Sequence, residues 1–194
     1  GNGGSGITIP SIMISQANGN LLKNTMAAQK VTVSLYDSSG ATTKQYDSDF
    51  DNGIISHEYG HGISTRLTGG PDNSDCLTNQ EQMGEGWSDF FALVMTHKPG
   101  AKGPDKRGIG TYAIDEPTTG DGIRDYPYST DLNINPVTYN NIKTFSVPHG
   151  VGSVWCSMLW DMYWDLIDKY GYDSDIYNGK GGNNIAMKLV IDGM

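Results

Sequence analysis

Two histidines and a glutamate form the pattern in this sequence that could do chemistry. His57 and His61 lie four residues apart, so on a helix their side chains share one face and can bind a single metal ion. Glu58 follows the first histidine, which places its carboxylate beside the metal without taking a ligand position. There it can accept a proton from a metal-bound water. The pattern predicts a hydrolytic zinc centre.

A catalytic zinc ion needs a third protein ligand and one open coordination position. Ser64 and Leu67 exclude the extended three-histidine motif of the metzincins, so the ligand must come from elsewhere. Glu85 is the favoured ligand because a glycine on each side lets the backbone approach the metal site closely. Glu81, one helical turn earlier, is the reserve candidate.

Asp89 follows Glu85 by four residues and would share its helix face. An aspartate there can accept the free ring N–H of His57 or His61 and fix the tautomer of that histidine. The alternative interpretation is that Glu85 and Asp89 belong to a solvated helix face. The histidine motif just upstream favours the ligand interpretation.

Helices must carry these residues, and the apolar spacing predicts four of them. The first is capped by Asp51 or Asn52, and the second by Asn79. The third is apolar on most faces and is therefore expected to be buried. The expected ranges are about 53–67, about 80–97, 151–170, and a helix that starts near 183 and is cut off by the chain end.

Two further regions frame the helices. Residues 98–148 are rich in Gly, Pro, Asp and Asn and are expected to form an ordered loop region. Residues 7–36 read as strand, helix and strand, with the helix over 18–30. The predicted fold is mainly α with long ordered loops, preceded by this small strand–helix–strand piece. The aromatic residues expected to pin the loop region are Tyr112, Tyr126, Tyr128 and Tyr139.

Composition narrows the class of protein. Of the 194 residues, 22 are acidic and 13 basic, giving a net charge of −9, which argues against nucleic acid as a partner. The acidic residues comprise 18 Asp but only 4 Glu, so each Glu merits inspection. No apolar run approaches the length of a membrane span. The chain opens without Met and stops inside an apolar pattern, so we expect a segment of a longer protein.

Several separated blocks, in the same order, resemble the fungalysin family of secreted zinc metallopeptidases, which share the thermolysin-like plan. The resemblance covers about residues 47–194. It implies that His57, His61 and Glu85 bind one zinc ion and that Glu58 is the general base and acid. The matching blocks are residues 49–64 and 66–70 around the histidines, 83–89 around Glu85, 126–130, 149 with 154–155, and 183–186 with 190–194.

The resemblance also bears on the groups that stabilise the reaction. His149, at the start of the third expected helix, is implied to donate to the oxyanion of the tetrahedral intermediate, with a structural or capping role as the alternative. Residues 62–84 lack the oxyanion-directed Tyr of thermolysin; Tyr112, Tyr126 or Tyr128 could replace it. Arg124 could hold a substrate carbonyl or form a salt bridge.

The amino-terminal part resembles a different module. Residues 9–15 and 31–35 are similar to the carboxy-terminal end of a protease-associated domain, so we expect residues 1–46 to be a partial segment of that domain. Residues 47–194 are then the catalytic segment of the peptidase.

Other polar residues have plainer interpretations. His97 ends the second expected helix and is interpreted as a partner of the helix dipole. Cys76 and Cys156 could form a disulfide in a secreted protein, or Cys156 could be a buried small apolar residue and Cys76 could pair beyond residue 194. Calcium is conceivable at the Asp-rich turns, but no EF-hand spacing supports it.

These observations together predict a secreted zinc-dependent endopeptidase that hydrolyses proteins or peptides. Zinc would activate a water, Glu58 would carry the proton to the leaving amine, and His149 would stabilise the oxyanion. The alternatives are a catalytically silent zinc-stabilised binding module, which would have no use for Glu58, and an exopeptidase, which would need a site for the substrate amino terminus. The sequence predicts no oligomeric state.

Overall fold

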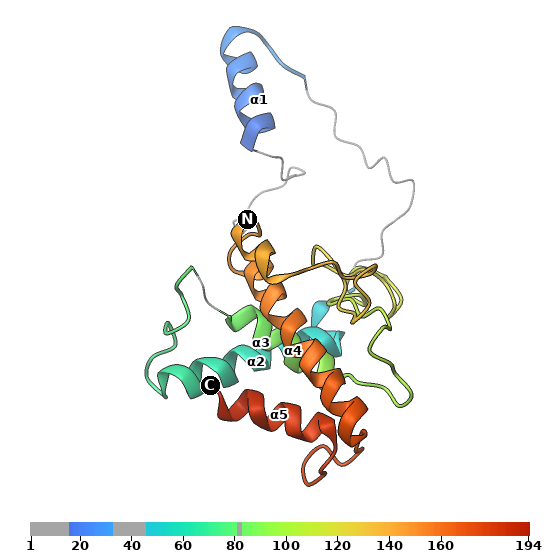
Figure 1. Cartoon of the computed structure of the whole chain (residues 1–194). Coiled ribbons are helices and arrows are strands. Elements are labelled where there is room, and N and C mark those ends of the chain that lie inside the picture. The colour runs from blue at the N-terminus through green and yellow to red at the C-terminus, as the bar shows by residue number, and fades with distance from the viewer. Residues whose placement is uncertain (1–15, 33–45, 81–82) are drawn as a thin grey trace. The chain divides into compact units, whose positions relative to one another are not determined.

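The computed structural model describes residues 16–32, 46–80 and 83–194 (Figure 1). The chain divides into two compact units, residues 1–42 and 43–194, and each is considered by itself. The first unit contains helix α1 (Gln16–Ala28), close to the helix expected over 18–30. The strand expected over 7–15 and most of the strand expected over 31–36 lie outside the described residues. The protease-associated segment therefore stays a prediction.

The second unit is a stack of helices in which each packs on the next. Helix α2 contacts α3, α3 contacts α4, and α4 contacts α5, and the long α4 crosses the others (orange in Figure 1). The mainly α fold is confirmed: in the described residues the only β pairing is one isolated bridge between Arg107 and Tyr128. The elements are η1 (Ser48–Phe50), α2 (Asn52–Gly69), α3 (Gly84–Met95), η2 (Tyr139–Lys143), α4 (His149–Tyr170) and α5 (Gly182–Asp192).

Asp51 fixes the start of α2, the helix that carries both histidines. Its Oδ1 accepts hydrogen bonds from the backbone N–H groups of Gly53 at 2.8 Å and Ile54 at 3.2 Å, which otherwise lack partners in the first turn. Its Oδ2 accepts from the N–H of Tyr112 at 3.1 Å. Asp51 therefore caps the helix and ties the long loop to it.

Helix α3 begins later than the sequence predicted. It starts at Gly84, with Met83 at the N-cap position and no side-chain capping bond, whereas the apolar spacing suggested a start near 80 with Asn79 as the cap. Turns occupy the described residues from 71 to 80, and in this polar stretch Asn79 is one of several residues that suit turns as well as caps. Glu81, the reserve ligand, lies outside the described residues.

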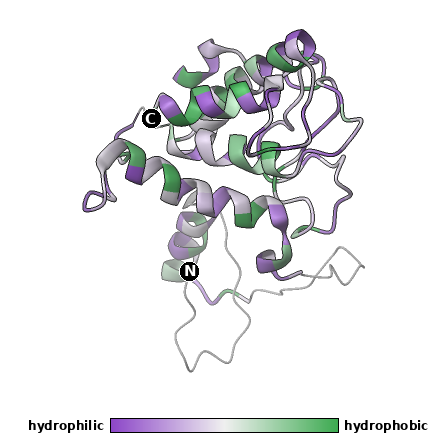
Figure 2. Cartoon of the chain, turned by 90° about the horizontal axis from the view of Figure 1, so that it is seen from below, coloured by the Kyte–Doolittle hydropathy of each residue, from purple (hydrophilic) through white to green (hydrophobic). Residues whose placement is uncertain are grey.

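Eleven of the 22 residues of α4 are buried, as its apolar faces predicted. Trp160 and Tyr163 stack with ring centroids 4.9 Å apart, and Phe90 of α3 meets Tyr163 edge-on at 6.1 Å. Leu93 of α3 and Ala186 of α5 complete the core between the three helices. Figure 2 shows hydrophobic residues, in green, interspersed with hydrophilic residues, in purple, along the helices. No helix among the described residues is long and apolar enough to span a bilayer.

The loop region 98–148 is held differently from the prediction. Of the four tyrosines expected to pin it, only Tyr128 is buried, at 1% exposure, whereas Tyr112, Tyr126 and Tyr139 are exposed. The backbone of Tyr128 pairs with Arg107 through two hydrogen bonds of 2.8 and 2.9 Å. Of the four tyrosines, Tyr128 therefore anchors the loop in the core, and this bridge adds to the bonds that Asp51 makes with the loop.

His97 is a packing residue rather than a charged dipole partner. Its ring stacks on Tyr172 with centroids 4.3 Å apart, and its Nδ1 lies 3.0 Å from the hydroxyl of Tyr163. Burial, together with nearby Arg107, lowers the pKa of His97, which favours the neutral ring. The dipole interpretation is therefore wrong.

The cysteines do not pair with each other: both are free in the structure. Cys156 is fully buried on α4 and belongs to the apolar core, which is the alternative that the sequence offered. Cys76 lies near the end of α2, where its Sγ is 3.4 Å from the carbonyl oxygen of Thr65.

Glycines allow α3 and α4 to approach closely beside Glu85. A Cβ atom added at Gly86 would lie 2.3 Å from the carbonyl oxygen of Gly152, and one added at Gly152 would lie 2.5 Å from Cβ of Glu85. Both contacts are far below van der Waals distance. Glycine is therefore required here by the packing of the two helices and not by an unusual backbone conformation.

We expect Gly86→Ala to destabilise the fold by roughly 1–3 kcal/mol, because the added methyl group overpacks the contact between α3 and α4. Gly62→Ala is the matched control: it is also a helical glycine, but an added Cβ meets nothing within 4 Å, so the change should be neutral or stabilising. Urea unfolding of the two variants in the full-length gene product checks this. Equal stabilities would contradict the packing argument.

Candidate metal centre

Three side chains from α2 and α3 converge on one point. Nε2 of His57 lies 3.1 Å from Nε2 of His61 and 3.1 Å from Oε2 of Glu85, and the distance from His61 Nε2 to Glu85 Oε2 is 3.7 Å. Four ligands placed tetrahedrally at zinc–ligand distances of 2.0–2.1 Å lie about 3.3 Å from one another. The three donor atoms therefore have the mutual spacing that one tetrahedral metal ion requires, and they form a possible metal-binding group.

Glu85 provides a second sign that this group suits a cation. Its Oε2 atom is buried and faces the ring nitrogens of His57 at 3.1 Å and His61 at 3.7 Å. A buried carboxylate is costly unless cationic partners surround it, and a bound metal ion would be such a partner. Two imidazoles and one carboxylate are a donor set that zinc accepts. The residues therefore fit the metal that the sequence pattern predicts.

Asp89 lies behind His57 and is fully buried. Its Oδ1 is 2.7 Å from Nδ1 of His57 and 2.8 Å from Nη2 of Arg124. Its Oδ2 accepts from Nε of Arg124 at 2.8 Å and from the hydroxyl of Tyr128 at 2.6 Å. Because Nδ1 of His57 donates to this carboxylate, Nε2 is the ring atom that could serve as a metal ligand.

The charges of this cluster are strongly coupled. Burial opposes the charged forms, but the hydrogen bonds from Arg124 and His57 lower the pKa of Asp89 to about 2. Burial of His57 is likewise outweighed by its hydrogen bonds to Asp89 and Glu85, which raise the pKa of His57 to about 9. Without a metal, His57 therefore carries two protons near neutral pH. Metal binding must displace the proton on Nε2.

Glu58 lies on α2 beside the ligands but outside their cluster. Its side chain is exposed, and it makes no hydrogen bond or ion pair with any residue that the structure describes. It lines an open groove of about 1100 Å³ bordered by α2, α3 and α5. Its carboxylate is therefore free to interact with a solvent molecule or a substrate.

His149 also reaches the cluster, from the first residue of α4. Its Nε2 lies 3.5 Å from Oε1 of Glu85, and its side chain is 58% exposed. Three helices thus contribute to one site: α2 provides both histidines and Glu58, α3 provides Glu85 and Asp89, and α4 provides His149. The close contacts at Gly86 and Gly152 bring α4 to this position.

Sequence reasoning left open the roles of Arg124 and Tyr128, and the structure places both on Asp89. Arg124 is 9% exposed at its side chain and forms a two-pronged ion pair with Asp89; its Nη2 is also 3.7 Å from Oε2 of Glu85. The hydroxyl of Tyr128 donates to Asp89, so it is not directed at an oxyanion. Neither contact could be found from spacing, because both residues lie in a loop without periodicity.

The paired helices bring together a histidine–histidine–glutamate cluster that could hold a metal ion. Comparison with protein-family models gives the particular family: the model described as Fungalysin metallopeptidase (M36) matches residues 2–194. The chain belongs to the fungalysin family.

Curated relatives agree with this assignment. The chain is 45% identical over 161 residues to "Extracellular metalloproteinase MEP" of Neosartorya fischeri and to "Extracellular metalloproteinase mep" of Aspergillus fumigatus, over 79% of this chain and 25% of each relative. It is 45% identical over 156 residues to "Extracellular metalloproteinase 2" of Arthroderma gypseum, over 76% of this chain and 24% of that relative. The chain spans about a quarter of the length of the curated relatives it matches.

Proposed function

We propose that the protein containing this chain is a secreted zinc-dependent endopeptidase that hydrolyses peptide bonds of proteins. The observation that carries the proposal is the convergence of His57, His61 and Glu85, with the exposed carboxylate of Glu58, which has no hydrogen bond or ion pair among the described residues, on the same helix. Membership of the fungalysin family and the extracellular metalloproteinases among its relatives support it. In this proposal, residues 47–194 are the catalytic segment and residues 1–46 belong to a protease-associated domain.

One zinc ion would be held by His57, His61 and Glu85. Zinc bound in this way polarises a substrate carbonyl and makes a bound water acidic near neutral pH. Asp89 would keep His57 in the tautomer whose Nε2 can serve as a ligand, through the 2.7 Å hydrogen bond at Nδ1. Arg124 and Tyr128 would in turn hold Asp89 ionised and fixed in position.

Glu58 would be the group that moves the proton. Its carboxylate would take a proton from the attacking water and pass it to the leaving amine, so that it acts as general base and then as general acid. Its lack of any hydrogen bond or ion pair among the described residues supports this role, because its carboxylate is not committed to a structural contact.

His149 would stabilise the transition state. A ring N–H at the start of α4, close to Oε1 of Glu85, is placed to donate to the negative charge that develops on the substrate oxygen. Tyr126 is a further candidate donor because its side chain is exposed and it lies two residues from Arg124, whereas Tyr128 is used by Asp89.

A zinc-stabilised binding module without turnover remains the alternative function. It predicts the same three ligands but assigns no role to Glu58. Calcium has no support beyond the Asp-rich turns.

Chelation tests the proposed function. Casein hydrolysis by the full-length gene product should be lost after dialysis against a chelator and should return when zinc is restored, because the activated water depends on the metal. Circular dichroism of the chelated sample shows whether the helices are retained, so that loss of metal can be told apart from loss of fold. Hydrolysis that persists with metal below one-tenth of an equivalent would rule out a zinc peptidase. A folded, zinc-loaded protein without hydrolysis would favour the binding module.

A further inference from the structure

The open groove of about 1100 Å³ that Glu58 borders lies between α2 and α5. Phe91 and Val94 of α3 line it and are only 4% and 8% exposed, so they form its floor. Helix α2 packs on α3, and α5 packs on α4, which leaves the space between α2 and α5 open. Among the described residues, the three proposed metal ligands do not line this groove.

The groove reaches the face of α2 that is turned away from the metal ligands. Successive residues of an α-helix are about 100° apart, so Tyr59, which lines the groove, is about 200° from both His57 and His61. Glu58 is about 100° from Tyr59 and lies between the two faces. A partner that covered Tyr59 would therefore leave the metal face of α2 open.

Apolar side chains from three helices are exposed along the groove. Tyr59 of α2 is 75% exposed, Met95 of α3 53%, and Ile191 of α5 38%. Burying apolar surface contributes about 25 cal/mol per Å², so covering these side chains would stabilise the protein. A continuous exposed apolar surface of this kind is typical of an interaction site.

The shape of the groove suits an α-helix. Its two sides are helices and its floor is a third helix, so a helix placed between the sides would pack on all three. A small-molecule site is instead a pocket of about 300–1,000 Å³ that encloses most of its ligand. The charged residues of the described lining are all exposed, so they can contact the polar face of an amphipathic helix; they are Asp49, Glu58, Lys188 and Asp192.

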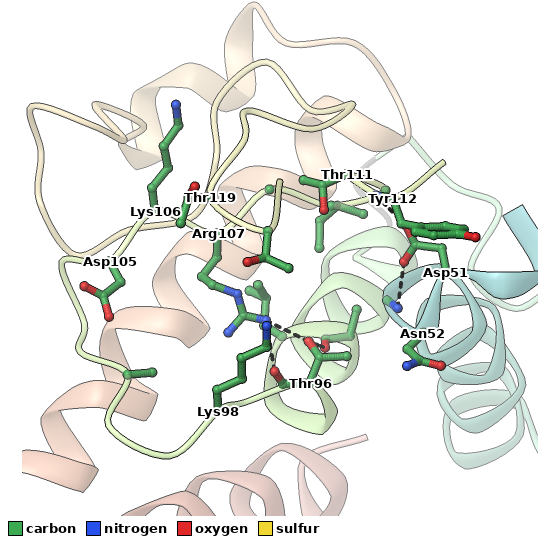
Figure 3. Close-up of a pocket in the computed structure, with 18 of the residues that line it drawn as sticks. Asp51, Asn52, Thr96, Lys98, Asp105, Lys106, Arg107, Thr111, Tyr112 and Thr119 are labelled. Carbon is green, nitrogen blue, oxygen red and sulfur yellow. Dashed lines mark hydrogen bonds between the residues drawn. The ribbon is translucent and has the colours of Figure 1, made fainter. Parts of the chain in front are cut away.

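A second cavity in this unit, of about 630 Å³, differs in this respect (Figure 3). Polar side chains of its lining have partners within the fold. Nη2 of Arg107 donates to the hydroxyl of Thr96 at 2.7 Å, and Oδ2 of Asp51 accepts from the N–H of Tyr112 at 3.1 Å. These groups are satisfied without a further partner, whereas the apolar side chains along the groove are left in water.

The relatives of this chain point to a partner in the same gene product. The stretch shared with the metalloproteinase of Neosartorya fischeri is 25% of that relative, so most of such a protein lies outside it. A segment that follows residue 194 would begin beside the groove, because Ile191 and Asp192 line it and Met194 packs against the core. Tethering would give that segment an effective concentration of about 1 mM, well above that of a second copy in solution.

We propose that an amphipathic helix from the part of the gene product that follows residue 194 packs into this groove and covers Tyr59, Met95 and Ile191. The helix would support α2 from the face opposite the metal ligands, so that the element that carries both histidines is packed on two sides. The proposal does not depend on the peptidase function, because it concerns the packing of α2, α3 and α5 and not the reaction.

Thiol labelling of the full-length gene product tests whether the groove is covered. Tyr59→Cys and Met95→Cys each place a thiol in the groove, and Asp168→Cys places one on the exposed side of α4 as the matched control. Mass spectrometry after reaction with iodoacetamide gives the rate at each site. In the folded protein both groove thiols should react at least about tenfold more slowly than the control, and in urea all three should react alike. Equal rates in the folded protein would overturn the proposal.

Photo-cross-linking identifies what covers the groove. Benzoylphenylalanine in place of Tyr59, in the full-length gene product, should form a cross-link within one chain, to a peptide that follows residue 194. The same substitution at Tyr139, which is 70% exposed and does not line the groove, is the control and should not form that cross-link. A cross-link to a second copy or to any other segment, or no cross-link at all, would contradict the proposed occupant.

Discussion

Glu58→Gln is expected to leave zinc bound and to lower the rate of casein hydrolysis by about 10²- to 10⁴-fold. The expected size is that of removing a general base. Glu58 lies outside the ligand cluster and makes no hydrogen bond or ion pair with any residue the structure describes, so the amide should disturb neither the metal centre nor the fold. The loss should appear in kcat more than in KM, because the carboxylate acts on the reacting proton.

The matched control for this variant is Asp168→Asn, which changes an exposed carboxylate of α4 into an amide away from the cluster. It should retain full activity. Zinc content and thermal unfolding should be measured on both variants. Hydrolysis by Glu58→Gln at the wild-type rate would remove Glu58 from the mechanism, whereas a loss of zinc would mean that its role is in metal binding.

Asp89→Ala has the second large expected effect, and it falls on stability as well as on metal binding. The change leaves the buried side chain of Arg124 with only its longer 3.7 Å ion pair to Glu85, and it removes the acceptor for the hydroxyl of Tyr128. Breaking a buried ion pair from one side costs about 3–5 kcal/mol. Loss of the contact to Nδ1 of His57 should weaken zinc binding about 10- to 100-fold.

The pH dependence of stability gives an independent check of this ion pair. Because the pKa of Asp89 is lowered to about 2 in the folded protein, its contribution is present above its ordinary value near 4 and is lost as the pH falls toward 2. The difference in free energy of unfolding between wild type and Asp89→Ala, measured by urea unfolding, should therefore be larger at pH 7 than at low pH. Compared with Asp89→Ala, Asp89→Asn should recover part of the metal affinity. If Asp89→Ala were as stable as wild type at pH 7, the ion pair would not contribute to stability as argued.

The part of the site that lies within single helices was predictable. The separation of His57 from His61, and of Glu85 from Asp89, translates directly into a shared face because the helical repeat is fixed. The burial of α4 followed from its apolar faces for the same reason. In each case one element determines the geometry, so residue spacing carries the information.

What depends on contacts between elements was not predictable. The close approach of α2 to α3 requires Gly60, where an added Cβ would lie 2.9 Å from Cα of Ser88. The periodicity of the sequence does not indicate such a contact. Arg124 and Tyr128 reach Asp89 from a loop whose path depends on tertiary packing. The start of α3 was placed too early because Asn79 suits turns as well as helix caps.

Zinc analysis of the full-length gene product tests the central claim most directly. Mass-spectrometric metal analysis should find about one zinc per chain in wild type and in Glu58→Gln. It should find a severe loss in Glu85→Ala, because of these two glutamates only Glu85 belongs to the group that could hold a metal. A wild-type protein that folds but binds no zinc, or a Glu85→Ala variant that keeps a full equivalent, would contradict the assignment of His57, His61 and Glu85 as the metal centre.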